Sequence, residues 1–255
     1  MSSTSTCDYI LKIQNLSITY KTSINPGKDL REVFIEVMTS PLKFLRRRPH
    51  SLELLKNINL TINKGERVGL IGINGCGKTS LCRAIAGMHG KQNNIQINGN
   101  VRAIFDTSAV LQPELSGYEN AMILVNLMYS DLNKKQRKDI VDEALEFSEL
   151  GDFRHSAFKY YSKGMKARLY LSIVSSKPCD LLILDEVFNG ADIFFNEKIT
   201  TRIKKMISKS SAVLFVSHST PTISEVCNRV CVIKDKKIAF DGDTQVGIDY
   251  YTNYC

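Results

Sequence analysis

The sequence predicts an α/β fold in which a mostly parallel sheet surrounds a phosphate-binding loop. An apolar run at 68–71 has the composition of a buried strand, and a glycine-rich loop at 72–79 follows it directly. Helical periodicity begins at once after the loop, with Leu81, Ala84 and Ile85 on one face. Further along the chain strands alternate with helical segments, which is typical of a parallel sheet with crossover helices.

Each element follows from its apolar spacing and its bounding turn residues. Strands are predicted at 9–13, 16–20, 54–62, 67–71, 94–97, 101–105, 181–184, 212–216, 230–233 and 237–240. The turn at 98–100 predicts that the strands at 94–97 and 101–105 form a hairpin. Helices are predicted at 78–88, 118–150 with a break near 130–133, 164–175, 196–208 and 222–228.

Composition limits the class of protein. The chain has 255 residues, 43% hydrophobic and 24% charged, as expected for a soluble globular protein of one large domain or two small ones. Its net charge of +8 favours an anionic partner, which a nucleotide, a nucleic acid or an acidic membrane surface would satisfy equally. Seven scattered cysteines without a C-x-x-C pair indicate a reducing compartment. No signal peptide and no apolar run long enough to cross a bilayer is present, so a membrane role requires docking onto another chain.

The segment 21–54 combines a loop-like stretch at 22–28, with a Pro-Gly turn signal, and an amphipathic pattern. Within it, residues 29–48 have one apolar helical face that is ended by Pro41 and followed by three consecutive arginines at 46–48. Such a helix can lie at an anionic bilayer surface. It can equally pack on the domain core, with the arginines as a solvated charge run.

The loop at 72–79 fits G-x-x-x-x-G-K-[ST] without a mismatch. Glycine lets backbone N–H groups surround phosphate oxygens, and the following helix adds its positive N-terminal end. Lys78 is expected to reach the β- and γ-phosphates and Thr79 to ligate Mg²⁺. The predicted nucleotide-binding residues of the loop are Gly72, Asn74, Gly75, Cys76, Gly77, Lys78, Thr79 and Ser80.

Two acidic residues end the apolar strand at 181–184. Neighbouring side chains on a strand point to opposite faces, so Asp185 and Glu186 can do different work. We expect Asp185 to hold Mg²⁺ and Glu186 to activate the attacking water as general base. His218 follows the strand at 212–216 and is either an ordinary strand-end histidine or a sensor of the γ-phosphate.

A third group of polar residues lies where the helix at 164–175 begins. Ser162 and Gly164 can offer hydroxyl and N–H donors to an anion there, or Ser162 can act simply as a helix cap.

With these residues in view, the chain resembles the ABC-type ATPases, a class of P-loop NTPase, over nearly its whole length. Residues 72–79 are similar to the Walker A loop and 181–186 to Walker B. Residues 162–165 are similar to the family signature, although Lys163 stands where a small residue is usual. His218 is similar to the switch histidine of the family, and Asp192 to its D-loop. The resemblance implies a RecA-like core, an antiparallel β subdomain and an inserted helical subdomain at 106–176 that ends in the signature helix. It also implies that ATP and Mg²⁺ bind between the loop of one copy and Ser162, Gly164, Met165 and Asp192 of a second copy in a homodimer.

Two stretches, 113–120 and 161–169, are similar to ATPases that export O-antigen, capsule or teichoic acid polysaccharides, and the insertion 21–54 fits the gate helix of that group. The resemblance implies an integral-membrane permease partner that handles the polysaccharide, and peripheral attachment at the cytoplasmic face of the cytoplasmic membrane. It assigns Asp106 to the Q-loop position near Mg²⁺ and Tyr20 to stacking on adenine. The chain ends soon after 241–242, so no C-terminal carbohydrate-binding domain is expected.

Two alternatives remain. A soluble ABC-type ATPase that acts on nucleic acid or ribosomes would explain the positive charge, but such proteins usually carry two cassettes or a long coiled coil. The basic residues also cluster beside the apolar helix instead of interleaving with aromatic residues, so no nucleic acid partner is expected. An ATPase of a different exporter is disfavoured by the insertion and by the stretch at 161–169.

Overall fold

The computed structural model describes residues 9–22, 50–90, 92–105, 111–185, 193–217 and 219–254. Five of the sequence predictions concern positions outside these ranges: the amphipathic helix at 29–48, Asp106, Glu186, Asp192 and His218. The residues that flank 29–48 are described, and they form the paired ends of two long strands, up to the pair Thr22 and His50.

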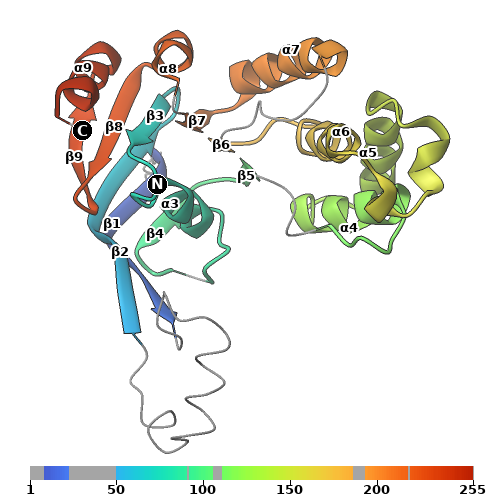
Figure 1. Ribbon diagram of the computed structural model, residues 1–255, viewed down its shortest axis with the longest axis horizontal. Coiled ribbons are helices and arrows are strands. Elements are labelled where there is room, and N and C mark those ends of the chain that lie inside the picture. Colours follow the sequence, from blue (N-terminus) through green and yellow to red (C-terminus); the bar gives the residue numbers. More distant parts are fainter. Residues whose placement is uncertain are drawn as a thin grey trace, which may run out of the picture.

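The central sheet confirms the predicted α/β class (Figure 1). Its strands are β3 (Arg67–Gly72), β5 (Val101–Ile104), β6 (Leu181–Asp185), β7 (Ala212–Val216), β8 (Arg229–Lys234) and β9 (Lys237–Gly242). They lie in the order β5-β6-β7-β3-β8-β9, and every neighbouring pair is parallel except β8 with β9. Because the strand that carries the phosphate-binding loop is in the middle, that loop emerges at the centre of one sheet edge.

A smaller antiparallel sheet has the order β2-β1-β4, with β1 Tyr9–Thr22, β2 His50–Asn63 and β4 Ile95–Ile97. The two strands expected at 9–13 and 16–20 form one strand with an irregularity at Asn15, whose φ is 53°. A short polar residue such as Asn tolerates this left-handed conformation, so pairing continues past it.

The prediction that the strands at 94–97 and 101–105 form a hairpin is wrong. β4 pairs with β1 in the small sheet, whereas β5 pairs with β6 in the central sheet. The turn between them is held by Asp180, whose Oδ2 accepts a hydrogen bond from the Asn100 amide at 2.9 Å. A Cβ at Gly99 would lie 2.4 Å from the same oxygen, so the chain passes close to Asp180 there and is led towards β6.

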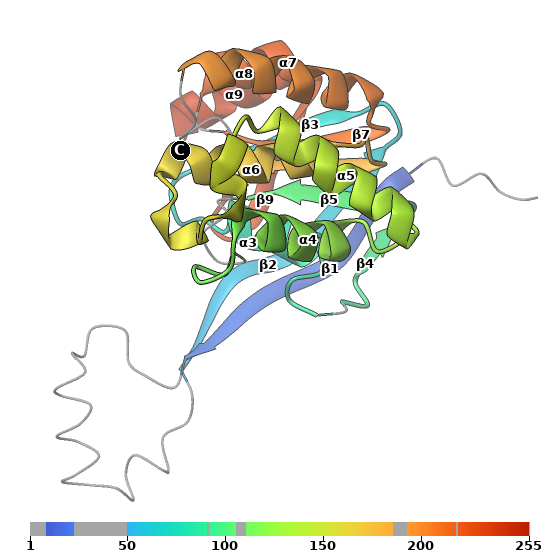
Figure 2. The same ribbon diagram turned by 90° about the vertical axis from the view of Figure 1, so that its right-hand side faces the viewer.

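The two faces of the central sheet belong to different parts of the core. Leu181 and Ile183 pack with β1, β2 and α3 (Lys78–Ile85), whereas Leu182 and Leu184 pack with helices. Those helices include α7 (Ile193–Lys209), α8 (Thr220–Val226) and α9 (Thr244–Tyr254), which Figure 2 shows across the sheet from α3. This alternation of faces is the period-2 pattern of a strand buried on both sides.

A helical segment is inserted between β5 and β6 and stands to one side of the sheet in Figure 1. It contains α4 (Gly117–Met128), α5 (Lys134–Phe147), the 3₁₀ turns η1 (Gly151–His155) and η2 (Phe158–Tyr160), and α6 (Lys163–Val174). The predicted break near 130–133 is confirmed, because Asn133 caps α5 by accepting a hydrogen bond from the Gln136 amide.

The stretches at 113–120 and 161–169, far apart in the sequence, meet in this segment. Ser116 and Ala157 form a β-bridge, and a Cβ at Gly117 would lie 2.0 Å from the Tyr161 hydroxyl. Asn120 is fully buried, and its side chain bonds the backbone of Gln112 in both directions, at 2.8 and 3.0 Å. The loop before α4 and the start of α6 are therefore one packed unit.

Within the described ranges, no helix combines the length and the apolar character needed to cross a bilayer.

Candidate functional site

A cavity of about 460 Å³ lies where the loop after β3 meets the end of β6. Its lining residues are Leu54, Asn74, Gly75, Gly77, Lys78, Thr79, Ser80, Arg83, Phe105 and Asp185. The cavity therefore brings the predicted phosphate-binding loop together with the predicted metal ligand from a strand more than 100 positions later. Leu54, Arg83 and Phe105 were not predicted. Of these, only Arg83 carried a sequence signal, since it lies one helical turn after Thr79.

The sheet topology explains this meeting. The carboxyl ends of β3, β6 and β7 share one edge, because Val216 at the end of β7 pairs with Leu70 on one side and with Asp185 on the other. Residues 186 and 218 come just after these strand ends in the sequence. Their roles stay predictions, since both positions lie outside the described ranges.

Lys78 is the buried cation of the site, with 6% of its surface exposed. Its Nζ donates hydrogen bonds to the carbonyl oxygens of Gly72 at 2.8 Å and Ile73 at 3.0 Å, and lies 3.9 Å from the Cys76 Sγ. The ammonium is thus held against the loop backbone by neutral acceptors. Because these acceptors carry no full charge, a phosphate oxygen can displace them with a gain in electrostatic energy.

The N-terminus of α3 differs from those of the neighbouring helices. Ser116, Asn133 and Ser162 each cap a helix by accepting a hydrogen bond from a backbone amide two or three residues into it. Among the described residues no side chain does so for α3, whose N-cap is Gly77. The first amides of α3 and the positive end of its dipole therefore point at the cavity, as an anion site requires.

The structure also shows what two of the loop glycines do. Gly72 lies against the next strand, and a Cβ there would be 2.6 Å from the backbone oxygen of Ile233. Gly77 has φ of 103°, and a Cβ there would be 2.9 Å from the Leu55 Cδ2. Glycine at these positions is thus required by packing and backbone conformation, in addition to the predicted access of N–H groups to phosphate.

Replacing Gly77 with alanine should lower the free energy of unfolding by about 2–3 kcal/mol, because a left-handed backbone and a steric contact are both penalised. Gly75 is the matched control. It has φ of 78° but open space around its missing Cβ, so Gly75→Ala should cost about 1 kcal/mol. Urea unfolding of the nucleotide-free protein measures both values. Equal losses would show that the Leu55 contact contributes nothing.

Cys82 lies one turn into α3, fully buried beneath the loop. Burial raises the pKa of this thiol well above its usual value, and the Asp185 carboxylate raises it further, while Lys78 opposes them. The thiol is therefore neutral at physiological pH. It adds no negative charge next to the phosphate-binding loop.

The remaining described candidates lie away from the cavity. Tyr20 packs edge-on against His89, with ring centroids 5.5 Å apart and its hydroxyl 3.2 Å from Nε2, and it is not a lining residue. Its role towards adenine stays a prediction. Ser162 is exposed at the start of α6, where its hydroxyl accepts a hydrogen bond from the Met165 amide at 3.2 Å. Ser162 does not line the cavity of its own chain, and neither do Gly164 and Met165.

Comparison with known proteins gives a consistent result. Residues 55–189 match the family model described as ABC transporter. The O-antigen export system ATP-binding protein RfbE of Yersinia enterocolitica is 34% identical over 222 residues, which cover 86% of this chain and 92% of that protein. The teichoic acids export ATP-binding protein TagH of Staphylococcus haemolyticus (strain JCSC1435) is 28% identical over 96% of this chain and 88% of its own length. A solved dimeric, post-hydrolysis structure of the ATP-binding cassette MJ0796 with ADP and Pi has the same fold, with a TM-score of 0.65 at 20% identity over 92% of this chain and 98% of its own.

Proposed function

This chain belongs to the ABC transporter family, and from that membership we propose that it is the ATP-hydrolysing subunit of a polysaccharide exporter. The cargo class is a lipid-linked or cell-surface polysaccharide such as O-antigen, capsule or teichoic acid, since the relatives belong to export systems for O-antigen and teichoic acids. The single observation that carries the ATPase assignment is the cavity in which the loop at 72–79 faces Asp185.

Nucleotide binding follows from the groups around that cavity. The amides at the start of α3, which no described side chain caps, and the Lys78 ammonium bind the phosphates in this proposal. The Thr79 hydroxyl and the Asp185 carboxylate, both of which line the cavity, are oxygen ligands of the kind that Mg²⁺ takes, and Asp106 is a further candidate ligand. Bound Mg²⁺ would neutralise charge on the β- and γ-phosphates.

Hydrolysis in this proposal needs a base and a γ-phosphate contact from the same sheet edge. Glu186 accepts a proton from a water molecule, whose oxygen attacks the γ-phosphorus as the bond to the ADP oxygen breaks. His218 donates a hydrogen bond to the γ-phosphate. Lys78 stabilises the charge that develops on the transferred group.

A complete site in this proposal needs a second copy of the chain. Ser162 and Lys163 are exposed and lie outside the cavity of their own chain, so this end of α6 is available to the nucleotide on a partner. Gly164, Met165 and Asp192 would complete that face. ATP then joins the two copies through its γ-phosphate, and loss of that phosphate weakens the contact and lets the pair open.

The membrane permease is the second proposed partner. Because 113–120 and the start of α6 form one packed unit, a movement at Ser162 would be transmitted to a subunit docked beside that unit. The basic segment at 29–48 would lie against anionic headgroups at the cytoplasmic face of the cytoplasmic membrane. Polysaccharide would be handled mainly by the permease.

Co-purification tests this proposal. The tagged chain, expressed with the products of its neighbouring genes and extracted in mild detergent, should retain an integral-membrane protein in roughly equal amount. The tag alone, expressed in the same background, is the control. Recovery of RNA or ribosomal proteins without a membrane protein, abolished by ribonuclease, would instead favour the nucleic-acid alternative.

A further inference from the structure

Arg202, a largely buried cation on α7, contacts the end of α6 opposite Ser162. We propose that Arg202 is a positioning residue for ATP hydrolysis, because it fixes the direction of α6 and thereby the place at which Ser162 meets a nucleotide on a second copy. The inference rests on the proposed function, in which α6 serves the partner's site.

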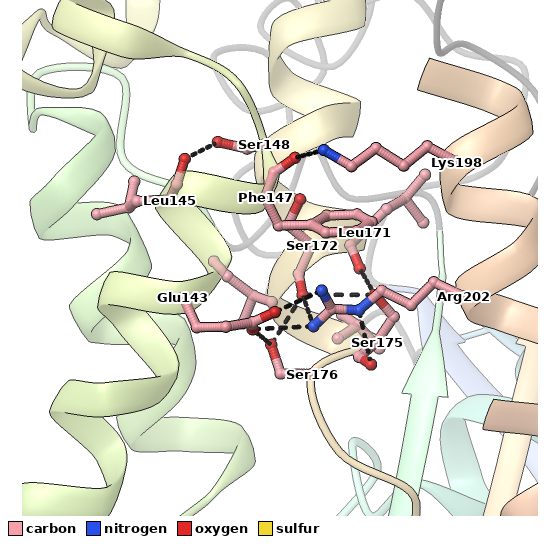
Figure 3. A network of polar contacts seen from close by, with 12 residues as sticks. Glu143, Leu145, Phe147, Ser148, Leu171, Ser172, Ser175, Ser176, Lys198 and Arg202 are labelled. Atoms are coloured by element: carbon pink, nitrogen blue, oxygen red, sulfur yellow. Dashed lines mark hydrogen bonds and ion pairs between the residues drawn. The ribbon is translucent and has the colours of Figure 1, made fainter. Parts of the chain in front are cut away.

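The contacts of Arg202 are shown in Figure 3. Its Nη1 and Nη2 donate to the two carboxylate oxygens of Glu143 on α5, at 2.6 and 2.9 Å. Its Nε donates to the Ser175 carbonyl at 3.1 Å and its Nη2 to the Ser172 carbonyl at 3.5 Å, both at the end of α6. The guanidinium carbon lies 4.1 Å from the centre of the Phe147 ring. Since the side chain is only 15% exposed, solvent screens these contacts weakly.

Two other side chains, Tyr129 and Arg102, donate hydrogen bonds at or just beyond the same end of α6. The Tyr129 hydroxyl donates to the Ile173 carbonyl at 2.7 Å, and the Arg102 Nη1 donates to the Lys177 carbonyl at 2.7 Å. The last carbonyls of a helix have no partner within it, and here Tyr129 and Arg202 donate to those of Ile173 and Ser172, while Arg102 holds the chain just beyond the helix. The guanidinium of Arg202 also suits the negative end of the helix dipole.

Arg202 differs from Tyr129 and Arg102 in its place in the chain. It lies in α7, which is the next element after β6 and therefore follows the strand that carries Asp185. Tyr129, by contrast, directly follows α4 and lies in the same helical segment as α6. Arg202 thus makes a directional, polar link between α6 and the helix that follows the strand carrying Asp185.

The length of α6 makes its direction matter. With 12 residues the helix is about 18 Å long, so a tilt of about 5° at the Arg202 end would move Ser162 by about 1.5 Å. A misplacement of about 1 Å can cost about 10²-fold in rate. Apolar packing of Leu169, Ile173 and Val174 holds α6 in place but is not directional, whereas hydrogen bonds are.

The test compares Arg202→Ala and Arg202→Lys with the wild-type chain. We expect kcat for ATP hydrolysis to fall by about tenfold or more in both, because lysine cannot make the forked contact with Glu143. The Kd of each isolated chain for a fluorescent ATP analogue should change less than twofold, since Arg202 does not line the nucleotide cavity. Glu143→Gln keeps one acceptor oxygen for Arg202, so its kcat should fall less than that of Arg202→Ala.

Lys198→Ala is the matched control. Lys198 lies one turn earlier on α7 and also reaches the α5 end, where its Nζ contacts the Glu149 Oε1 at 2.5 Å, but its side chain is 40% exposed and makes no bond to α6 that the structure records. We expect its kcat to stay within twofold of wild type. Equal losses in Lys198→Ala and Arg202→Ala, or a rise in Kd that parallels the loss of kcat, would overturn the inference. A wild-type chain that neither binds nor hydrolyses ATP would overturn the proposed function instead.

Discussion

Replacing Lys78 with methionine should lower the ATPase rate by about 10³-fold. The ammonium is 6% exposed and is surrounded by backbone carbonyls of the loop, so in this poorly solvated place its charge interacts strongly with a phosphate. Methionine has a similar length and an apolar body that fills the same space without the charge. A coupled assay of phosphate release, with the wild-type chain in parallel, measures the loss.

Arg83 provides the matched control for Lys78. It is a second cation lining the cavity, but its side chain is exposed to solvent, which screens its charge. We expect Arg83→Met to change the rate by less than about tenfold. Thermal unfolding of both variants checks that each chain is folded. A folded Lys78→Met chain with normal turnover would remove the loop from the chemistry and with it the proposed function.

Glu186→Gln should lower turnover by about 10²- to 10⁴-fold while ATP binding persists, because glutamine keeps the shape of the side chain but accepts no proton from water. The γ-phosphate then stays uncleaved. We expect the variant to form dimers with Mg·ATP that size-exclusion chromatography with light scattering detects, and to remain monomeric with Mg·ADP.

The control for this second experiment is Glu197→Gln, which removes an exposed carboxylate on α7 and changes the net charge by the same amount. It should hydrolyse ATP at the wild-type rate and form no long-lived dimer. Normal hydrolysis by Glu186→Gln would exclude Glu186 as the base. Slow hydrolysis without ATP-dependent dimers would leave the base in place and contradict the proposed assembly.

Several elements could be predicted because their signals are local. The break between α4 and α5 was visible in the sequence, since Asn133 and Gln136 form a capping box within four residues. The start of α6 was also visible, because Ser162 is a favoured N-cap residue and accepts a hydrogen bond from the Met165 amide. By contrast, α9 was missed. It contains Gly247 and several aromatic residues that do not favour a helix, and it depends on packing such as the stacking of Tyr250 on Phe240, at 5.6 Å between ring centroids.

The prediction of a hairpin at 94–105 failed because the contact that decides the course of the chain there is not local. Asn98 to Asn100 has the composition of a hairpin turn, and no local feature distinguishes it from one. Its course is decided by Asp180, which lies 80 positions later and bonds the Asn100 amide. A strand's partner is chosen by burial in the whole sheet, which a short window of sequence does not contain.

By itself the sequence determined the loop at 72–79 and predicted that it binds phosphate, because glycine, lysine and threonine at that spacing specify a backbone shape and a set of donors within eight positions. Only the tertiary structure decided what faces the loop. The strand order placed Asp185 across the cavity from Thr79, added Arg83 and Phe105 to its walls, and brought Arg202 to the far end of α6. Such meetings depend on which apolar faces are buried together across the whole chain, and that is a property of the packed core.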